Sequence, residues 1–312
     1  MKFTIHQSSR QGTRPYNQDR LAYSYSKDAL LLVLADGMGG RQHGEIAAHL
    51  AVKTLTDAFQ RLAVPTLSSP AKFLTQNIQQ VHDMIANNTQ TEHLAEKPGT
   101  TIVAAVIQHG TLYFAHVGDS RLYHFRDGHL LFCTEDHSIV QSLYRRGVIQ
   151  FEEMAQHPYR NRIYNCLGGE QPPKIELSDK HELLEGDTIL LCTDGVWGGL
   201  DDQKIKEILH SNTIDNAIDN AIIELLDTAE YNNGEDSDNL SAIGLQWGDR
   251  QMSNFAISTV TMPLGATTTI MNPIFDLEEE GNSLNNDLTD DDIENTIAAI
   301  QAALSKAKQT RT

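Results

Sequence analysis

The amino-acid sequence predicts an α+β protein with antiparallel sheets. Three strand-like stretches, 101–107, 111–117 and 121–125, follow one another with only turn-length gaps, and such neighbouring strands pair antiparallel. Two other stretches, 45–62 and 69–88, carry apolar residues at three- and four-residue spacing, which is typical of amphipathic helices. Helices and strands are therefore both expected, without the regular alternation of a parallel sheet.

The first thirty residues predict two strands and a loop between them. Two short strand-like pieces lie within residues 1–29, on either side of a polar loop from Arg10 to Asp19. Six consecutive apolar residues, Leu30 to Ala35, then predict a strand that is buried on both faces. This run ends on Asp36, followed by glycines at positions 37, 39 and 40. The carboxylate either needs a positive partner or is an exposed cap of the next helix, and both readings are open here.

The middle of the chain continues the strand pattern. Residues 108–110 and 127–128 each predict a tight turn after a strand, and residues 138–147 predict a short helix. Residues 148–165 are polar and show no regular period. The last predicted elements of this part are a strand at 188–193, helices at 201–210 and 213–229, and a strand at 240–247.

The composition changes near residue 250, so we expect one domain at 1–250 and an extension after it. Residues 251–288 are rich in Thr, Asn, Asp and Glu, and predict an acidic, flexible linker. Residues 289–308 predict an amphipathic helix that would bind a partner, self-associate, fold back on the domain or simply fray in solvent. Its apolar stripe consists of Ile293, Ile297, Ile300 and Leu304.

Charge and cysteine content exclude several classes of protein. The formal net charge is −18, which argues against nucleic acid as a partner and is compatible with cation binding. Three widely spaced cysteines, 133, 166 and 192, do not form a disulfide framework or a Cys-x-x-Cys zinc motif. The sequence shows neither a signal-peptide pattern nor a run of about 20 apolar residues. We therefore expect a cytoplasmic protein with no membrane partner.

Four aspartates lie at the ends of predicted strands. Asp36 and Asp194 each follow a dry strand and precede a glycine, Asp119 follows another strand, and Asp238 precedes the last one. Each of these alone is a common turn residue. If the sheets gather them at one edge, however, several ionised carboxylates cannot share a site without a cation. An all-oxygen donor set of this kind suits Mg²⁺ or Mn²⁺.

In their order along residues 10–246, six short motifs resemble those of the metal-dependent protein phosphatases of type 2C, the PPM family, in its bacterial form. Singly these motifs are weak, but six in register are specific. They are Arg14-Pro-Tyr-Asn-Gln-Asp19, Asp36-Gly-Met-Gly-Gly40, Gly99-Thr-Thr101, Val117-Gly-Asp-Ser-Arg121, Thr193-Asp-Gly195 and Asp238-Asn239. The resemblance implies a four-layer α-β-β-α sandwich of two antiparallel sheets flanked by helices.

The resemblance also implies a role for each matching residue. Asp36 would bridge two Mn²⁺ or Mg²⁺ ions, with the carbonyl of Gly37 on one ion and Asp194 and Asp238 on the other. Asp119, with Asp194, would hold a third ion. The two remaining residues implied at the site are Arg14, which would grip the substrate phosphate, and Asp19, a further acidic residue near the metals.

The activity implied is hydrolysis of phosphoserine and phosphothreonine in proteins, by direct attack of a hydroxide that bridges the two metals. The enzyme would oppose a bacterial Ser/Thr kinase. The alternative is a catalytically weak regulatory or scaffold protein on the same fold, acting through its C-terminal helix. The retained aspartates and Arg14 speak against that alternative.

Two departures from the family leave open questions. Gln18 replaces a glutamate found in many members, so one water-mediated metal contact is in doubt. Met38 stands where animal members have a histidine proposed as the general acid, and His43 is a weak substitute. Four arginines lie in the region that resembles the family's mobile flap, where they would either guide an acidic phosphopeptide or form a solvated surface: Arg145, Arg146, Arg160 and Arg162.

Overall fold

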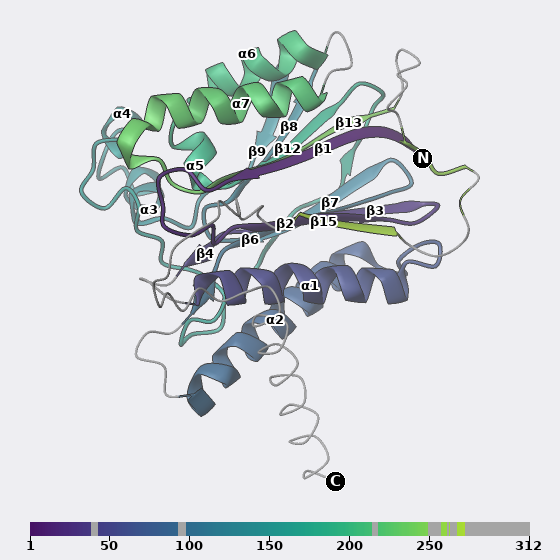
Figure 1. The fold of residues 1–312 in the computed structure, drawn as a ribbon, viewed down its shortest axis with the longest axis horizontal. Helices are drawn as coiled ribbons and strands as arrows, with labels where there is room; N and C mark the ends of the chain where they lie inside the picture. The colour runs from purple at the N-terminus through teal and green to yellow at the C-terminus, as the bar shows by residue number, and fades with distance from the viewer. Residues whose placement is uncertain are drawn as a thin grey trace, which may run out of the picture.

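The computed structural model describes residues 1–38, 43–92, 98–213, 218–248, 257–260, 262 and 267–271. These residues form two large antiparallel sheets, a two-stranded ribbon and helices on both outer sides (Figure 1). The α+β class and the four-layer arrangement implied by the family resemblance are confirmed.

The first large sheet contains the N-terminal strand and the last long strand of the fold. In spatial order its strands are β14 (Ile257–Ser258), β1 (Lys2–Arg10), β13 (Leu240–Trp247), β12 (Thr188–Cys192), β8 (Arg121–Arg126) and β9 (His129–Cys133). The central pair β1 and β13 is in register along its whole length, from Phe3 opposite Trp247 to Arg10 opposite Leu240. The N-terminal strand is therefore held beside the last long strand of the fold.

The second sheet is built around the apolar strand predicted from the sequence. Its strands, in order, are β10 (Glu176–Leu177), β7 (Thr111–Val117), β6 (Ile102–Gln108), β3 (Ala29–Ala35), β2 (Arg20–Tyr25) and β15 (Thr267–Met271), with β11 (His181–Glu182) also paired to β7. The small ribbon joins β4 (Gly37–Met38) to β5 (Gly99–Thr100) at the end of this sheet.

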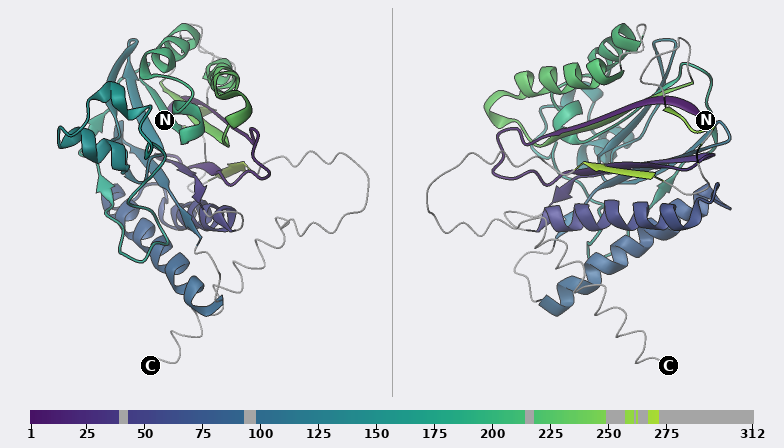
Figure 2. Two further views of the ribbon diagram at one scale, coloured as in Figure 1. Left: turned by 90° about the vertical axis from the view of Figure 1, so that its left-hand side faces the viewer. Right: turned by 45° about the vertical axis from the view of Figure 1, so that its right-hand side comes forward.

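Helices cover the outer face of each sheet. The long helices α1 (Gly44–Leu62) and α2 (Pro70–Glu92) lie against the second sheet. The first sheet is covered by α5 (Asp194–Trp197), α6 (Asp202–Thr213) and α7 (Ile218–Asn233). Two short helices, α3 (Ile139–Arg145) and α4 (Phe151–Met154), lie with α5 and β4 at one end of the sandwich, on the left in Figure 1. Figure 2 shows the same layers from two further directions.

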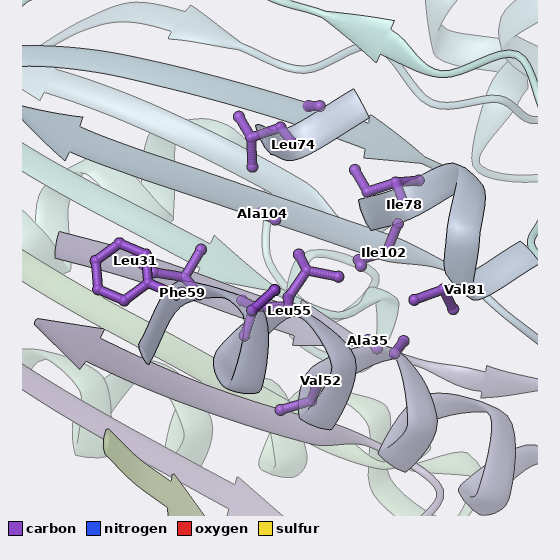
Figure 3. Close-up of a cluster of buried hydrophobic side chains, with 14 of the residues drawn as sticks. Leu31, Ala35, Val52, Leu55, Phe59, Leu74, Ile78, Val81, Ile102 and Ala104 are labelled. Carbon is purple, nitrogen blue, oxygen red and sulfur yellow. The ribbon is translucent and has the colours of Figure 1, made fainter. Parts of the chain in front are cut away.

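The buried strand β3 connects two hydrophobic cores. Its odd-numbered residues, such as Leu31 and Ala35, face α1 and share one apolar cluster with Leu55 of α1 and Ile78 of α2 (Figure 3). Its even-numbered leucines face the core between the sheets. All seven residues of β3 are buried, as the continuous apolar run predicts, because side chains alternate between two dry faces.

The predicted turns are confirmed where a left-handed backbone is needed. The β6–β7 turn has His109 at φ 53° and Gly110 at φ 70°, and the β8–β9 turn has Asp127 at φ 48° and Gly128 at φ 73°. Positive φ at both central residues is the turn geometry that fits the twist of a hairpin. The sequence missed β9 itself, the short strands β10 and β11, and α4 inside the stretch expected to be irregular.

The expected domain end at residue 250 and the linker at 251–288 differ from the structure. Within that segment β14 pairs with β1, and β15 pairs with β2 from Thr267 opposite Tyr25 to Met271 opposite Leu21. The chain after residue 250 thus extends both sheets. The predicted helix at 289–308 lies outside the described residues. Within the ranges that the structure describes, no helix combines the length and apolarity needed to cross a bilayer.

Candidate metal centre

Asp36 is held at the end of β3 by the motif that begins at Gly99. The amide of Thr101 donates to the carbonyl of Asp36 at 2.9 Å, and the hydroxyl of Thr100 donates to the same oxygen at 2.8 Å. The amide of Asp36 in turn donates to the hydroxyl of Thr101 at 3.1 Å. The main chain of Asp36 is fixed on both sides, so its carboxylate has a defined starting position at the sheet end.

Gly37 lies where only a glycine fits. A Cβ at this position would collide with the carbonyl of Gly44 at the start of α1 and would crowd the carbonyl of Gln18. The amide of Gly37 donates to that Gln18 carbonyl at 3.2 Å. This close approach brings the loop before β2 and the first turn of α1 against the turn that follows Asp36.

Asp194 and Asp238 are brought together by another close backbone contact. Asp194 begins α5 directly after β12, and a Cβ on the next residue, Gly195, would collide with the carbonyl of Asn239. The side chain of Asn239 accepts from the amide of Gln18 at 2.8 Å and donates to the carbonyl of Tyr16 at 2.9 Å. One asparagine thus ties the strand end that carries Asp238 to the loop that carries Arg14 and Asp19.

Asp119 and Asp19 form the deeper part of the cluster. Both are buried, with exposed fractions of 6% and 1%. The indole N–H of Trp197 in α5 donates to the carbonyl of Asp119 at 3.0 Å. The hydroxyl of Thr193 donates to Oδ2 of Asp19 at 3.0 Å, whereas Oδ1 of Asp19 is buried without a partner. An acceptor oxygen of that kind is available to a ligand.

The electrostatics of the cluster call for a cation. Burial raises the pKa of Asp36 and Asp194 well above the usual value, and each is raised further by the other carboxylates. Burial raises the pKa of Asp119 to about 7 and that of Asp19 to about 6, with Asp238 adding to both. Five carboxylates therefore repel one another in a partly desolvated site. Their donor atoms are all oxygens, which is the donor set that Mg²⁺ and Mn²⁺ prefer.

Arg14 is the cation that this structure places at the rim of the cluster. Its guanidinium lies 2.6 Å from Oδ2 of Asp238, and its side chain remains 56% exposed. The hydrogen bond to Asp238 raises the pKa of Arg14, and the charges of Asp194 and Asp36 also contribute. Arg20 beside Asp19 and Arg121 near Asp119 also oppose the repulsion, but these cations leave the pKa of both aspartates raised. Arg14 is the largely exposed guanidinium among them and is accessible to an anion from solvent.

The aspartates, Gly37 and Arg14 that the sequence predicts for the metal site lie in or beside this cluster. Gln18, at the position of the missing glutamate, donates from Nε2 to Glu45 at 3.0 Å. His43 has a left-handed backbone with φ 87° and a buried Nδ1 that has no partner, and none of its described contacts reaches the five carboxylates. The indole of Trp197 packs against the core beside the first sheet and also donates to Asp119, and the sequence indicated neither this bond nor the connecting role of Asn239.

Two sheets that gather five carboxylates at one end, beneath an exposed guanidinium, form a site suited to divalent cations and an anionic ligand. Comparison with known sequences makes this specific. The profile of the family described as Protein phosphatase 2C matches residues 7–228, and the chain belongs to this family.

Relatives and solved structures agree with the family match. The serine/threonine phosphatase Stp of Listeria monocytogenes is 34% identical over 200 residues, which cover 64% of this chain and 79% of Stp. A serine/threonine phosphatase of S. agalactiae superposes with a TM-score of 0.70 at 31% identity, over 78% of this chain and 99% of its own. The catalytic domain of PstP in complex with two manganese ions superposes with a TM-score of 0.65 at 28% identity, over 78% of this chain and 98% of its own. The chain is a protein serine/threonine phosphatase of the type 2C family.

Proposed function

We propose that Asp36 bridges two divalent ions, with the carbonyl of Gly37 on one ion and Asp194 and Asp238 on the other. Burial of Asp36 and Asp194, together with the repulsion from the other carboxylates, raises the pKa of both and is the observation that supports a cation site here. The division of the ligands between the two ions is what the family resemblance implies. We further propose that Asp119, with Asp194, contributes to a third cation position, and that the unpartnered oxygen of Asp19 faces the centre.

The ions would supply Lewis-acid activation of a water molecule and neutralisation of charge on the phosphoryl oxygens. The protein's own residues do the positioning. The hydrogen bonds with Thr100 and Thr101 fix the main chain of Asp36, and the close contact of Gly195 with Asn239 fixes Asp194 against Asp238. The guanidinium of Arg14, which pairs with Asp238 in this structure, would offer its planar fork to a substrate phosphate.

The side chain of Met38 has no proton to donate to the leaving serine or threonine oxygen. A residue at that position therefore does not act as a general acid in this chain. We propose that the leaving oxygen takes its proton from solvent at the centre. The described hydrogen bonds of His43 join its backbone to Glu45 and Ala47 at the start of α1, and none assigns its ring to this step.

We propose that the substrates are proteins phosphorylated in the cytoplasm by a bacterial-type Ser/Thr kinase. The names of the relatives support a Ser/Thr phosphoprotein substrate, and such a substrate requires a kinase to make it. The odd number of widely spaced cysteines suits a reducing compartment. Binding of a partner by the helix predicted at 289–308 stays a prediction.

The assignment of Asp36 is tested by Asp36→Asn, which keeps the shape of the side chain and removes its charge. We expect turnover of a phosphothreonine peptide to be abolished and Mn²⁺ binding, measured by calorimetry, to weaken. The matched control is Asp83→Asn, an exposed position on α2, which should behave as wild type. Near-normal kinetics in Asp36→Asn would reject the bridging role, and normal Mn²⁺ binding without activity would instead favour a role in chemistry alone.

A further inference from the structure

His137 lies where three parts of the molecule meet. Its backbone amide donates to the carbonyl of Gly118 at 3.0 Å, while its ring nitrogen Nδ1 accepts from the amide of Gly118 at 3.1 Å. Nδ1 is also 2.7 Å from the side-chain nitrogen of Asn165, and Nε2 is 3.2 Å from the carboxylate of Glu176 in β10. The ring is buried, and the carbonyl of His137 accepts from the amide of Tyr164 at 2.9 Å.

These contacts assign the protons on the imidazole. The amide of Gly118 can only donate, so Nδ1 of His137 carries a lone pair. The orientation of Asn165 is fixed as well, because its side chain forms a pair of hydrogen bonds with the backbone of Lys174, at 3.0 and 2.8 Å. Asn165 therefore also turns its N–H group to Nδ1. The neutral ring then has its proton on Nε2 and donates it to Glu176.

This assignment decides against a metal ion at the same place. His116, His137 and Glu176 present ligand atoms within 4.8 Å of one another, and the two rings stack with centroids 4.7 Å apart. His116 donates from Nε2 to the carbonyl of Glu135 and leaves Nδ1 without a partner, as a metal ligand would. The Nε2 atom of His137, however, is occupied by its proton. Coordination through Nε2 would move the proton of the neutral ring to Nδ1, which could then no longer accept from the amide of Gly118. The three residues therefore form a hydrogen-bonded cluster that supports the Gly118 turn.

The support acts on the turn that carries Asp119. Gly118 has φ 108°, a conformation that favours glycine, and it packs so tightly on Thr101 that a Cβ would lie 2.6 Å from the threonine side chain. Thr101 is the residue that clamps Asp36, and its hydroxyl lies 2.7 Å from that of Ser120. With Gly118 confined on one side by Thr101, both of its backbone polar groups are held by His137 on the other side.

We propose that His137 is a positioning residue that fixes the Gly118–Asp119 turn against the flap segment, residues 138–170, and so sets the position of the Asp119 carboxylate. The link to that segment runs through the contacts of His137 with Tyr164 and Asn165. This inference rests on the proposed contribution of Asp119 to the metal centre. Loss of a supporting partner of this kind typically costs 10- to 100-fold in metal affinity or activity.

Two isosteric variants separate the contacts of the ring. The Asn oxygen in His137→Asn lies as many bonds from the main chain as Nδ1 and can accept from Gly118. The Gln nitrogen in His137→Gln lies as many bonds away as Nε2 and can donate to Glu176 alone. We expect His137→Gln to lower kcat on a phosphothreonine peptide by roughly ten-fold or more, and to raise the Mn²⁺ concentration needed for half-maximal activity. His137→Asn should keep most of the wild-type kcat and nearly the wild-type Mn²⁺ concentration for half-maximal activity. A larger loss of kcat in His137→Asn than in His137→Gln would overturn the proposal.

A double-mutant cycle shows whether the effect passes through Asp119. We expect Asp119→Asn to lower kcat and the added His137→Gln substitution to lower it little further, because both act on one element. Additive losses in the cycle would overturn the positioning role while leaving the role of Asp119 intact. Wild-type kcat in Asp119→Asn alone would overturn both. The control is His116→Ala, which removes the stacked ring but no contact to Gly118, and an equal loss there would attribute the effect to packing.

Discussion

The metal-free enzyme should lose stability as the pH rises, because of the carboxylates at its own centre. The pKa of Asp119 is raised by burial from 3.8 to about 7, so the folded protein binds its proton more tightly than the unfolded chain does. The stabilisation linked to this group is complete below pH 4 and is lost as the pH rises through about 7. A rise of about 3 in pKa corresponds to about 4 kcal/mol, of which about 2 kcal/mol falls between pH 5.5 and 7.5.

The assay is the thermal midpoint of protein dialysed against EDTA, measured at these two pH values. For a domain of this size 1 kcal/mol shifts Tm by about 2–4 °C, so Asp119 contributes a fall of about 4–8 °C. Asp119→Asn should remove that fall and should be more stable than wild type in EDTA at pH 7.5. Saturating Mn²⁺ should make wild type the more stable of the two proteins. At 100 times its dissociation constant, a ligand adds about 2.7 kcal/mol to the free energy of unfolding of a protein that can bind it.

The matched control is Asp83→Asn, an exposed α2 carboxylate, which should keep the wild-type dependence on pH. The reasoning would be refuted if wild type and Asp119→Asn differed in Tm by the same amount at both pH values. It would also be refuted if Asp119→Asn were the less stable protein in EDTA at pH 7.5, because the wild-type carboxylate would then carry no electrostatic penalty.

Three further predictions concern the scaffold. Asp187→Asn should cost about 3 kcal/mol, measured by urea unfolding, because it leaves the guanidinium of Arg126 without its buried partner at 2.7 Å; unchanged stability would contradict the ion pair. The lowered pKa of Asp187, about 2, means that this stabilisation is present above pH 4 and lost as the pH falls towards 2. Gly195→Ala should lower both Tm and kcat, since its Cβ would collide with the carbonyl of Asn239, whereas wild-type values would show that the two turns can separate. Truncation after Trp247 should leave an active core with a lower Tm, because β14 and β15 are edge strands; an insoluble or inactive product would make them essential to the domain.

The parts of the fold that the sequence predicts are those with a local signal. The apolar run at 30–35 specifies a strand buried on both faces, because no polar residue interrupts either side. The pairs His109-Gly110 and Asp127-Gly128 specify hairpin turns, because they adopt the positive φ that such turns require. Recurrence of aspartate at strand ends predicts a shared cation site before any family is considered.

What the sequence leaves out depends on contacts between distant segments. The strand β15 lies in a Thr-rich stretch with no apolar alternation, and only its pairing with β2 reveals it as a strand. The roles of Asn239 and Trp197 come from side-chain hydrogen bonds to loops more than 70 residues away, which no spacing rule reports. His137 is separated from Glu176 by 39 residues and would be taken as one of 13 unremarkable histidines.

The central claim is that the carboxylate cluster holds the divalent cations on which phosphatase activity depends. The most direct measurement is the release of phosphate from a phosphothreonine peptide by protein dialysed against a chelator, followed by stepwise return of Mn²⁺. We predict no turnover in the chelated protein and a recovery that follows the binding of Mn²⁺ in wild type, with neither recovery nor tight binding in Asp36→Asn. Turnover that survives complete chelation would contradict the account.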